Sequence, residues 1–401
     1  MKRSKKEKPL IQEKLRVDLR EKYRDTLFHK WHLRDLSAMH RFVDSDDDSI
    51  IMSFSLPKPL GLQKAADLVI ESWDGGKTWA EYSGGRSWPD STRGIFRRGR
   101  AMIALHGGSE FRRSYDYGYT WGPPMKISTG DDIHFDGLGV PNCFSAIMIT
   151  AGTWAGRIVL VADYFLGQEG PGAQLMCSIY SDDWGDSWRA SRLFWPSDPL
   201  PKGPEGFGEP AVVQMSGGWL WMVFRTLYGE LWQCISQNGG ESWNHPTPTG
   251  LSSPIANCYA KRSPYTGATV LCWNMTKPGT DVSFKSRHGL YRPRTNLAFA
   301  ISRDNCRSWS CPVVIDPQGS QYPTIHFTKE KMFIMYQSAI NNEITAWHEQ
   351  GLTLVSYDRE EVEALPTWTR ETIQPYIEKG LVAHWLALNC PQGYPDWATI
   401  S

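Results

Sequence analysis

The sequence predicts an all-β protein, a six-bladed β-propeller whose blades are four-stranded antiparallel sheets. Two observations lead to this prediction: a turn motif that recurs along the chain, and an unusual composition. The 401 residues include 19 Trp, 16 Tyr and 15 Phe, together with 36 Gly and 26 Pro. Aromatic residues favour half-buried strands, and Gly and Pro favour turns, so this composition indicates many short strands.

The recurring motif is Ser-x-Asp/Asn-x-Gly/Cys-x-Thr/Ser-Trp. It occurs in full five times, at Ser72–Trp79, Ser114–Trp121, Ser181–Trp188, Ser236–Trp243 and Ser302–Trp309. A degraded sixth copy begins at Ser356, and successive copies start 42 to 67 residues apart. This spacing is typical of four-stranded propeller blades with insertions of variable length, which is why one copy per blade is expected.

Each copy of the motif follows an apolar run that is predicted to be a strand, such as residues 297–301. The Asp or Asn oxygen can accept hydrogen bonds from the turn amides, and the Gly tolerates a positive φ. The Trp packs a large apolar surface against the blade. We therefore interpret the motif as structural rather than catalytic. Cys306 replaces the Gly in the fifth copy, which predicts a strained or altered turn there.

The two ends of the chain are predicted to differ from the repeats. Residues 1–30 are highly charged and are expected to form a helical or partly disordered extension. Residues 31–401 are assigned to the propeller, and the segment after Trp368 is expected to close the last blade or cover one face.

The charge balance and the cysteines exclude several classes of protein. Lys+Arg and Asp+Glu are both 43, which argues against a nucleic-acid surface, and no apolar run is long enough for a transmembrane helix. The eight cysteines include no C-x-x-C pair, which argues against a zinc ribbon. No metal and no cofactor is expected. The basic N-terminus lacks the apolar core of a signal peptide, so we expect a cytoplasmic protein with free, buried thiols.

The repeats resemble the Asp boxes of the sialidase (neuraminidase) superfamily, and the resemblance extends over about residues 31–357. Residues 208–243 are similar to a sialidase unit in which a Glu, two apolar strands and a terminal Arg precede an Asp box. The resemblance implies that Glu209 activates the nucleophile and that Arg225 belongs to a cluster of three arginines that binds the substrate carboxylate.

The resemblance also implies the remaining members of the site. Arg294, before the strand into the fifth repeat, is similar to a second arginine of the cluster, with Arg292 as its competitor. Tyr322, at the start of a strand–turn–strand unit, is similar to the nucleophilic tyrosine. The third arginine belongs near the start of the first blade, where Arg34 is the first candidate and Arg41 the second.

One departure from the family concerns the acid/base aspartate, which sialidases carry in a loop before the first Asp box. That segment here reads SLPKPLGLQKAADLVIES, and the candidate that it offers is Asp67, next to the strand. The leading hypothesis is therefore a glycoside hydrolase acting on a terminal acidic sugar of an acidic glycan. Two alternatives stay open: a hydrolase or lyase for another acidic sugar, with Tyr322 or His134 in proton transfer, and a non-catalytic carbohydrate-binding propeller.

Overall fold

The computed structural model of the chain describes only part of its residues, and every structural statement below concerns that part. The described residues are 12–17, 40–43, 49–56, 66–81, 92–106, 109–129, 142–165, 174–194, 207–226, 228–275, 284–286, 289–291, 294–310, 312–339, 350–365 and 367–368. None of the helices in these ranges is long and apolar enough to span a membrane.

Five blades are four-stranded antiparallel sheets, each built from one stretch of the chain. The first contains β2 (His40–Phe42), β3 (Ile50–Leu56), β4 (Ala66–Ser72) and β5 (Ala80–Glu81). The second contains β6 (Thr92–Arg98), β7 (Ala101–His106), β8 (Glu110–Ser114) and β9 (Met125–Lys126). The third contains β10 (Asn142–Met148), β11 (Ile158–Phe165), β12 (Gln174–Ser181) and β13 (Arg189–Ala190).

The fourth blade contains β14 (Phe207–Gln214), β15 (Leu220–Thr226), β16 (Glu230–Ser236) and β17 (Thr247–Ser252). The fifth contains β18 (Tyr259–Arg262), β19 (Thr269–Asn274), β22 (Leu297–Ser302) and β24 (Val313–Asp316). A short hairpin of β20 (Phe284–Ser286) and β21 (Gly289–Tyr291) is inserted in the fifth blade, and β23 (Trp309–Ser310) pairs with β28 (Thr367–Trp368). The all-β propeller with four-stranded antiparallel blades is thus confirmed.

The last four-stranded sheet is composite, because it joins the two ends of the chain. It contains β25 (Ser320–Phe327), β26 (Lys331–Ala339), β27 (Gln350–Asp358) and, on its outer edge, β1 (Gln12–Val17). The prediction of six blades, each marked by one repeat, is therefore corrected to five continuous blades and one composite sheet. The prediction of a helical or disordered extension outside the propeller is also wrong for residues 12–17, because these residues pair along β27.

The composite sheet explains why the sixth copy of the motif is degraded. In the five blades the motif connects the third strand to the fourth, whereas β27 needs no such turn because β1 arrives from the other end of the chain. The chain turns instead into helix α2 (Arg359–Glu363), and Asp358 caps it by accepting a hydrogen bond from the Glu361 amide at 3.1 Å. The degraded copy thus retains its aspartate, which caps the N-terminus of a helix instead of stabilising a hairpin turn.

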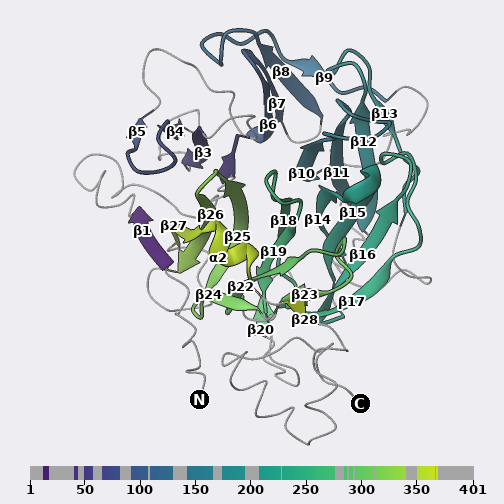
Figure 1. The fold of residues 1–401 in the computed structure, drawn as a ribbon. Helices are drawn as coiled ribbons and strands as arrows, with labels where there is room; N and C mark the ends of the chain where they lie inside the picture. The colour runs from purple at the N-terminus through teal and green to yellow at the C-terminus, as the bar shows by residue number, and fades with distance from the viewer. Residues whose placement is uncertain are drawn as a thin grey trace, which may run out of the picture.

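The innermost strands stand around a common axis, as Figure 1 shows, and each contacts the next in the order β2, β6, β10, β14, β18, β25 and back to β2. A hydrophobic cluster fills each junction between neighbouring sheets. Trp221 of β15 and Trp273 of β19, for example, are fully buried in one such cluster. These junctions fix the innermost strands relative to one another, which is the condition for a precise central site.

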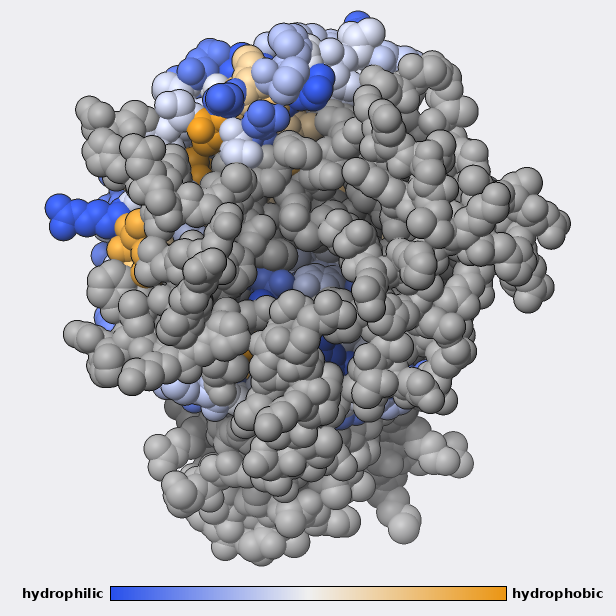
Figure 2. Space-filling view, turned by 180° about the vertical axis from the view of Figure 1, so that it is seen from behind, coloured by the Kyte–Doolittle hydropathy of each residue, from blue (hydrophilic) through white to orange (hydrophobic). Residues whose placement is uncertain are grey.

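The Asp-box turns form as the sequence predicts. In the fifth turn, Asp304 accepts hydrogen bonds from the Ser308 amide at 2.9 Å and from the Ser302 hydroxyl at 2.9 Å. Cys306 has a φ of 64°, so the expected strain at this position is present. Figure 2 shows the molecule from behind, where mainly hydrophilic residues cover the top, on the side of β6 to β9.

Candidate active site

Glu209 and Tyr322 meet across the ring although 113 residues separate them in the sequence. Glu209 is the third residue of the innermost strand β14, and Tyr322 is the third residue of the innermost strand β25. The Tyr322 hydroxyl donates a hydrogen bond to Oε1 of Glu209 at 3.1 Å. Glu209 is buried, whereas Tyr322 is partly exposed. A phenol that points its proton at a carboxylate is the arrangement that a tyrosine nucleophile and its base require.

Both residues sit in β-bulges of the same form. Glu209 and Pro210 stand opposite one residue of β15, and Tyr322 and Pro323 stand opposite one residue of β26. Glu209 has a φ of 50° and Tyr322 a φ of 53°, both in the left-handed region. Such a conformation costs a non-glycine residue about 1–3 kcal/mol, and bulges of this kind re-aim side chains next to active sites.

Arg225 and Asp163 complete a buried cluster around Glu209. Arg225, at the end of β15, lies with Nη1 3.0 Å from Oε2 of Glu209. The Asp163 carboxylate, on β11, accepts a long hydrogen bond of 3.5 Å from the Glu209 amide. Burial, followed by the charge of Glu209, raises the pKa of Asp163 from 3.8 to about 7. Asp163 therefore carries a proton over much of the range below neutral pH, and the carboxylate that contacts Arg225 is that of Glu209.

Arg294 also lies beside Tyr322. Its guanidinium carbon lies 5.7 Å from the centre of the Tyr322 ring, and Nη2 donates to the Ile255 carbonyl at 3.1 Å. Nη1 donates to the side chain of Gln321, which in turn donates to the side chain of Gln337 at 2.9 Å. These contacts hold the guanidinium beside the phenol, where a positive charge stabilises a negative one.

The electrostatics of the cluster suit an anionic ligand. With Asp163 protonated, Arg225, Arg294 and Glu209 sum to one positive charge beside the hydroxyl of Tyr322. Burial raises the pKa of Tyr322 above its ordinary value of 10, as does the charge of Glu209, whereas both arginines lower it. The phenol is therefore neutral at rest, and its ionisation requires Glu209 to accept the proton.

The structure brings four predicted residues together, Glu209, Tyr322, Arg225 and Arg294, and their chemical roles stay predictions. Arg225 contacts Glu209, so it is already engaged by a carboxylate of the protein. Arg34 lies outside the described residues, and so does the alternative His134. Asp67 lies within β4, where its backbone pairs with Ser55, and its role as acid/base stays a prediction.

Sequence reasoning missed Asp163 and Asn257. Asp163 follows the apolar run of β11 as one acidic residue among many, and Asn257 lies in the buried segment before β18. The Asn257 side-chain oxygen accepts a hydrogen bond from the Tyr322 amide at 2.9 Å. A polar residue beside a strand has many possible partners, so the sequence contains no signal that singles out either residue.

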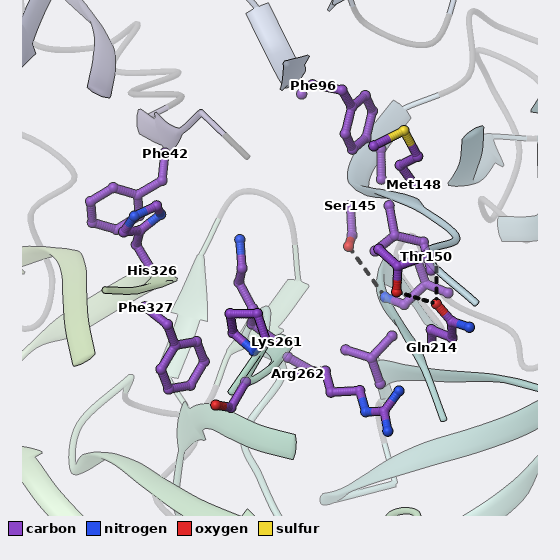
Figure 3. A pocket seen from close by; sticks show the side chains of 18 of the residues that line it. Phe42, Phe96, Ser145, Met148, Thr150, Gln214, Lys261, Arg262, His326 and Phe327 are labelled. Carbon is purple, nitrogen blue, oxygen red and sulfur yellow. Dashed lines mark hydrogen bonds between the residues drawn. The ribbon is translucent and has the colours of Figure 1, made fainter. Parts of the chain in front are cut away.

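A separate cavity of about 510 Å³ lies between the opposite ends of the innermost strands. Figure 3 shows Phe42 of β2, Phe96 of β6 and Phe327 of β25 around it. Gln214 holds two of these strands together there, because its side-chain oxygen accepts a hydrogen bond from the Thr150 amide at 2.8 Å. None of the four predicted residues that meet at the other end lines this cavity, so it is distinct from the candidate site. In the part of the chain that is described, no group of His, Cys, Asp and Glu could hold a metal ion.

Comparison with known proteins places the fold. The BNR repeat-like domain family matches residues 99–335, which is more than half of the chain. A search of curated proteins found no match. A structure of a protein of unknown function from Dyadobacter fermentans is similar with a TM-score of 0.57 and 15% identity, over 87% of this chain and 99% of that one.

Two sialidase structures are similar to the same extent. The intramolecular trans-sialidase from Ruminococcus gnavus, in complex with oseltamivir carboxylate, has a TM-score of 0.55 and 13% identity, over 84% of this chain and 98% of that one. A mutant of the NanB sialidase from Streptococcus pneumoniae has a TM-score of 0.55 and 12% identity, over 88% of this chain and 71% of that one. At these identities the likeness establishes the sialidase fold and no more.

Proposed function

The chain belongs to the BNR repeat-like domain family, and from this premise we propose that it is a sialidase-like glycoside hydrolase that removes a terminal acidic sugar from a glycan. The observation that carries the proposal is the hydrogen bond from the Tyr322 hydroxyl to Glu209, with Arg294 beside the same phenol. Similarity to sialidases and trans-sialidases, one of them bound to oseltamivir carboxylate, supports an acidic sugar as the substrate class.

In the proposed reaction Glu209 takes the phenol proton, and the Tyr322 oxygen forms a bond to the anomeric carbon. The bond from that carbon to the leaving oxygen breaks, and this oxygen takes a proton from the acid/base group, for which Asp67 is the sequence candidate. Water then cleaves the bond between tyrosine and sugar, so the configuration at the anomeric carbon is retained. A neutral phenol approaches an anionic sugar with less repulsion than a carboxylate would.

Substrate binding is assigned to the positive charge of the cluster. Arg294 presents a planar donor group beside the nucleophile, and Arg225 contacts Glu209, so the two guanidinium groups supply the positive charge that a substrate carboxylate would meet. Arg34 is proposed as the third arginine on the basis of the sequence alone. Below neutral pH, the proton on Asp163 avoids a second negative charge beside Glu209 and keeps the site attractive to an anion.

The test is turnover of a fluorogenic sialoside by the wild type and by Tyr322→Phe. We expect the substitution to lower kcat by about a thousandfold or more, because it removes the nucleophile. Tyr336→Phe is the matched control: Tyr336 is a buried tyrosine of the same sheet whose hydroxyl donates to Asp316 at 3.0 Å. This control should keep turnover within about threefold.

Wild-type protein that turns over neither the sialoside nor a panel of other acidic glycosides contradicts the proposal. Appearance of an ultraviolet absorbance from unsaturated sugars across that panel would identify a lyase instead. Binding of the acidic sugar by calorimetry without any turnover would identify a non-catalytic carbohydrate-binding propeller.

A further inference from the structure

The two bulges that carry Glu209 and Tyr322 each contain one backbone N–H group. The second residue of each bulge is a proline, Pro210 or Pro323, which has no N–H to donate. Because a bulge leaves its extra residue outside the regular ladder, the amides of Glu209 and Tyr322 need acceptors from elsewhere. These acceptors therefore stabilise the backbone conformation that orients the side chains of Glu209 and Tyr322 toward each other.

Asn257 provides the acceptor for Tyr322. Its side-chain oxygen lies 2.9 Å from the Tyr322 nitrogen, and the residue itself is buried. The segment that holds it is well anchored, because the neighbouring Ile255 carbonyl accepts a hydrogen bond from Arg294. One buried segment of the fifth blade thus holds both the backbone of the nucleophile and the guanidinium beside its ring.

Asp163, in the neighbouring sheet, provides the acceptor for the Glu209 amide. Its carboxylate lies 3.5 Å from the Glu209 nitrogen, a longer contact than that of Asn257. In each case the acceptor belongs to the blade that precedes the bulge around the ring: β11 of the third blade for Glu209, and the start of the fifth blade for Tyr322. At both bulges, a side-chain oxygen from the preceding blade therefore accepts the hydrogen bond of the bulge amide.

We propose that Asn257 and Asp163 are positioning residues, which hold Tyr322 and Glu209 in the left-handed conformation so that the phenol and the carboxylate face each other. The role in catalysis rests on the proposed function, whereas the hold on the backbone does not. Loss of the acceptor lets the bulge relax toward ordinary strand conformation, and the side chain then leaves its partner. A displacement of about 1 Å at reacting groups is enough for a loss of about a hundredfold in rate.

The experiment compares Asn257→Ala with Asn257→Asp, which keeps an acceptor oxygen at the same place. Turnover of the fluorogenic sialoside gives kcat and KM, and hydrogen exchange resolved at the single residue Tyr322 reports its amide. We expect Asn257→Ala to lower kcat by about 10- to 100-fold with KM within about threefold, and to speed exchange of that amide. Asn257→Asp should restore the protection of the Tyr322 amide, because it keeps the acceptor oxygen.

Gln214→Ala is the matched control, since it removes a side-chain oxygen that accepts the Thr150 amide between two blades at the opposite end of the ring. It should leave kcat and the Tyr322 amide unchanged. Asp163→Ala against Asp163→Asn repeats the comparison for the Glu209 amide. Unchanged exchange and unchanged kcat in Asn257→Ala would overturn the proposal, as would an equal loss of kcat in Gln214→Ala.

The two proposals fail in different ways. If the wild type turns over no acidic glycoside, the proposed function fails, while faster exchange of the Tyr322 amide in Asn257→Ala alone still supports the hold on the backbone. If the wild type is active and the exchange is the same in all variants, the positioning role fails and the proposed function stands.

Discussion

The Asp-box turns at the ends of the third strands and the bulges on the innermost strands both contain residues with positive φ, but they differ in where the stabilising hydrogen bonds come from. In both, a side-chain oxygen holds backbone amides in a turn with positive φ. In the second Asp box, Asp116 holds the Thr120 amide four residues away, whereas Asn257 and Tyr322 are 65 residues apart. The hydrogen bonds of an Asp box lie within one turn and stabilise each blade by itself. The hydrogen bond from the Tyr322 amide to Asn257 forms only in the assembled ring. A site between blades therefore depends on hydrogen bonds of this second kind.

The aspartates of the two regions also differ in charge. Hydrogen bonds from Thr120 lower the pKa of Asp116 to about 2, so this carboxylate is ionised under all ordinary conditions. Burial and the neighbouring Glu209 raise the pKa of Asp163 to about 7. An aspartate side chain is thus ionised in a solvated Asp-box turn, whereas in the buried cluster it is protonated below about neutral pH.

The largest effect that separates the two regions is expected from Glu209→Gln. This substitution keeps the shape of the side chain but removes the base, so kcat on the sialoside should fall by about a thousandfold. Glu241→Gln, in the fourth Asp box, removes a carboxylate that lies 3.0 Å from Arg157 and should leave kcat unchanged. Wild-type turnover in Glu209→Gln would show that the inner bulge is not the reacting centre.

The same contrast explains what the sequence could predict. The Asp boxes are local, since donor and acceptor lie within four residues, and they appear in the sequence as a repeat. Glu209, Tyr322, Arg225 and Arg294 were accessible through resemblance to a family. Asp163 was not, because its partner lies 46 residues away and no short pattern contains both.

The N-terminal strand β1 was beyond prediction for a similar reason. Its residues Gln12–Val17 lie in a highly charged stretch of the sequence, and they become a strand through pairing with the edge of β27 at the far end of the chain. The number of continuous blades depends on the same long-range pairing. Composition and repeats therefore indicated the class of fold, whereas the closure of the ring followed from tertiary contacts.

The next largest effect is expected on stability, from Gly76→Ala in the first Asp box. Gly76 has a φ of 89°, and a Cβ there would lie 2.4 Å from Cζ of Phe333 in the composite sheet. Backbone strain and overpacking together should lower the free energy of unfolding by about 2–3 kcal/mol. Urea denaturation measures this change. At a temperature where the variant remains folded, kcat should stay at the wild-type value. A fall in kcat there would contradict the view that the Asp boxes stabilise the blades without contributing to the site.

A smaller effect is expected in the pH dependence of stability. Between pH 4 and 7 the native protein keeps the proton of Asp163 that the unfolded chain loses near pH 3.8, so this group lowers the free energy of unfolding as pH rises. The Asp boxes act in the opposite sense, because their lowered pKa values make stability fall as pH drops below about 4. Asp163→Asn should flatten the first slope and leave the second, as measured by urea denaturation at a series of pH values.

The smallest effect is expected from Cys306→Gly, which restores the usual residue of the fifth Asp box. Relief of the positive φ contributes about 1 kcal/mol of stability, and the lost burial of the thiol and the extra freedom of the unfolded chain remove about as much. The free energy of unfolding should therefore change by less than about 1 kcal/mol.

The reciprocal substitution, Gly185→Cys in the third box, sharpens this comparison, because a Cβ at Gly185 would lie 2.9 Å from the ring of Phe111. It should cost about 2 kcal/mol. Effects of equal size and opposite sign would mean that backbone strain alone selects the residue. Unequal effects mean that the packing of the neighbouring blade decides where the motif requires Gly and where it accepts Cys.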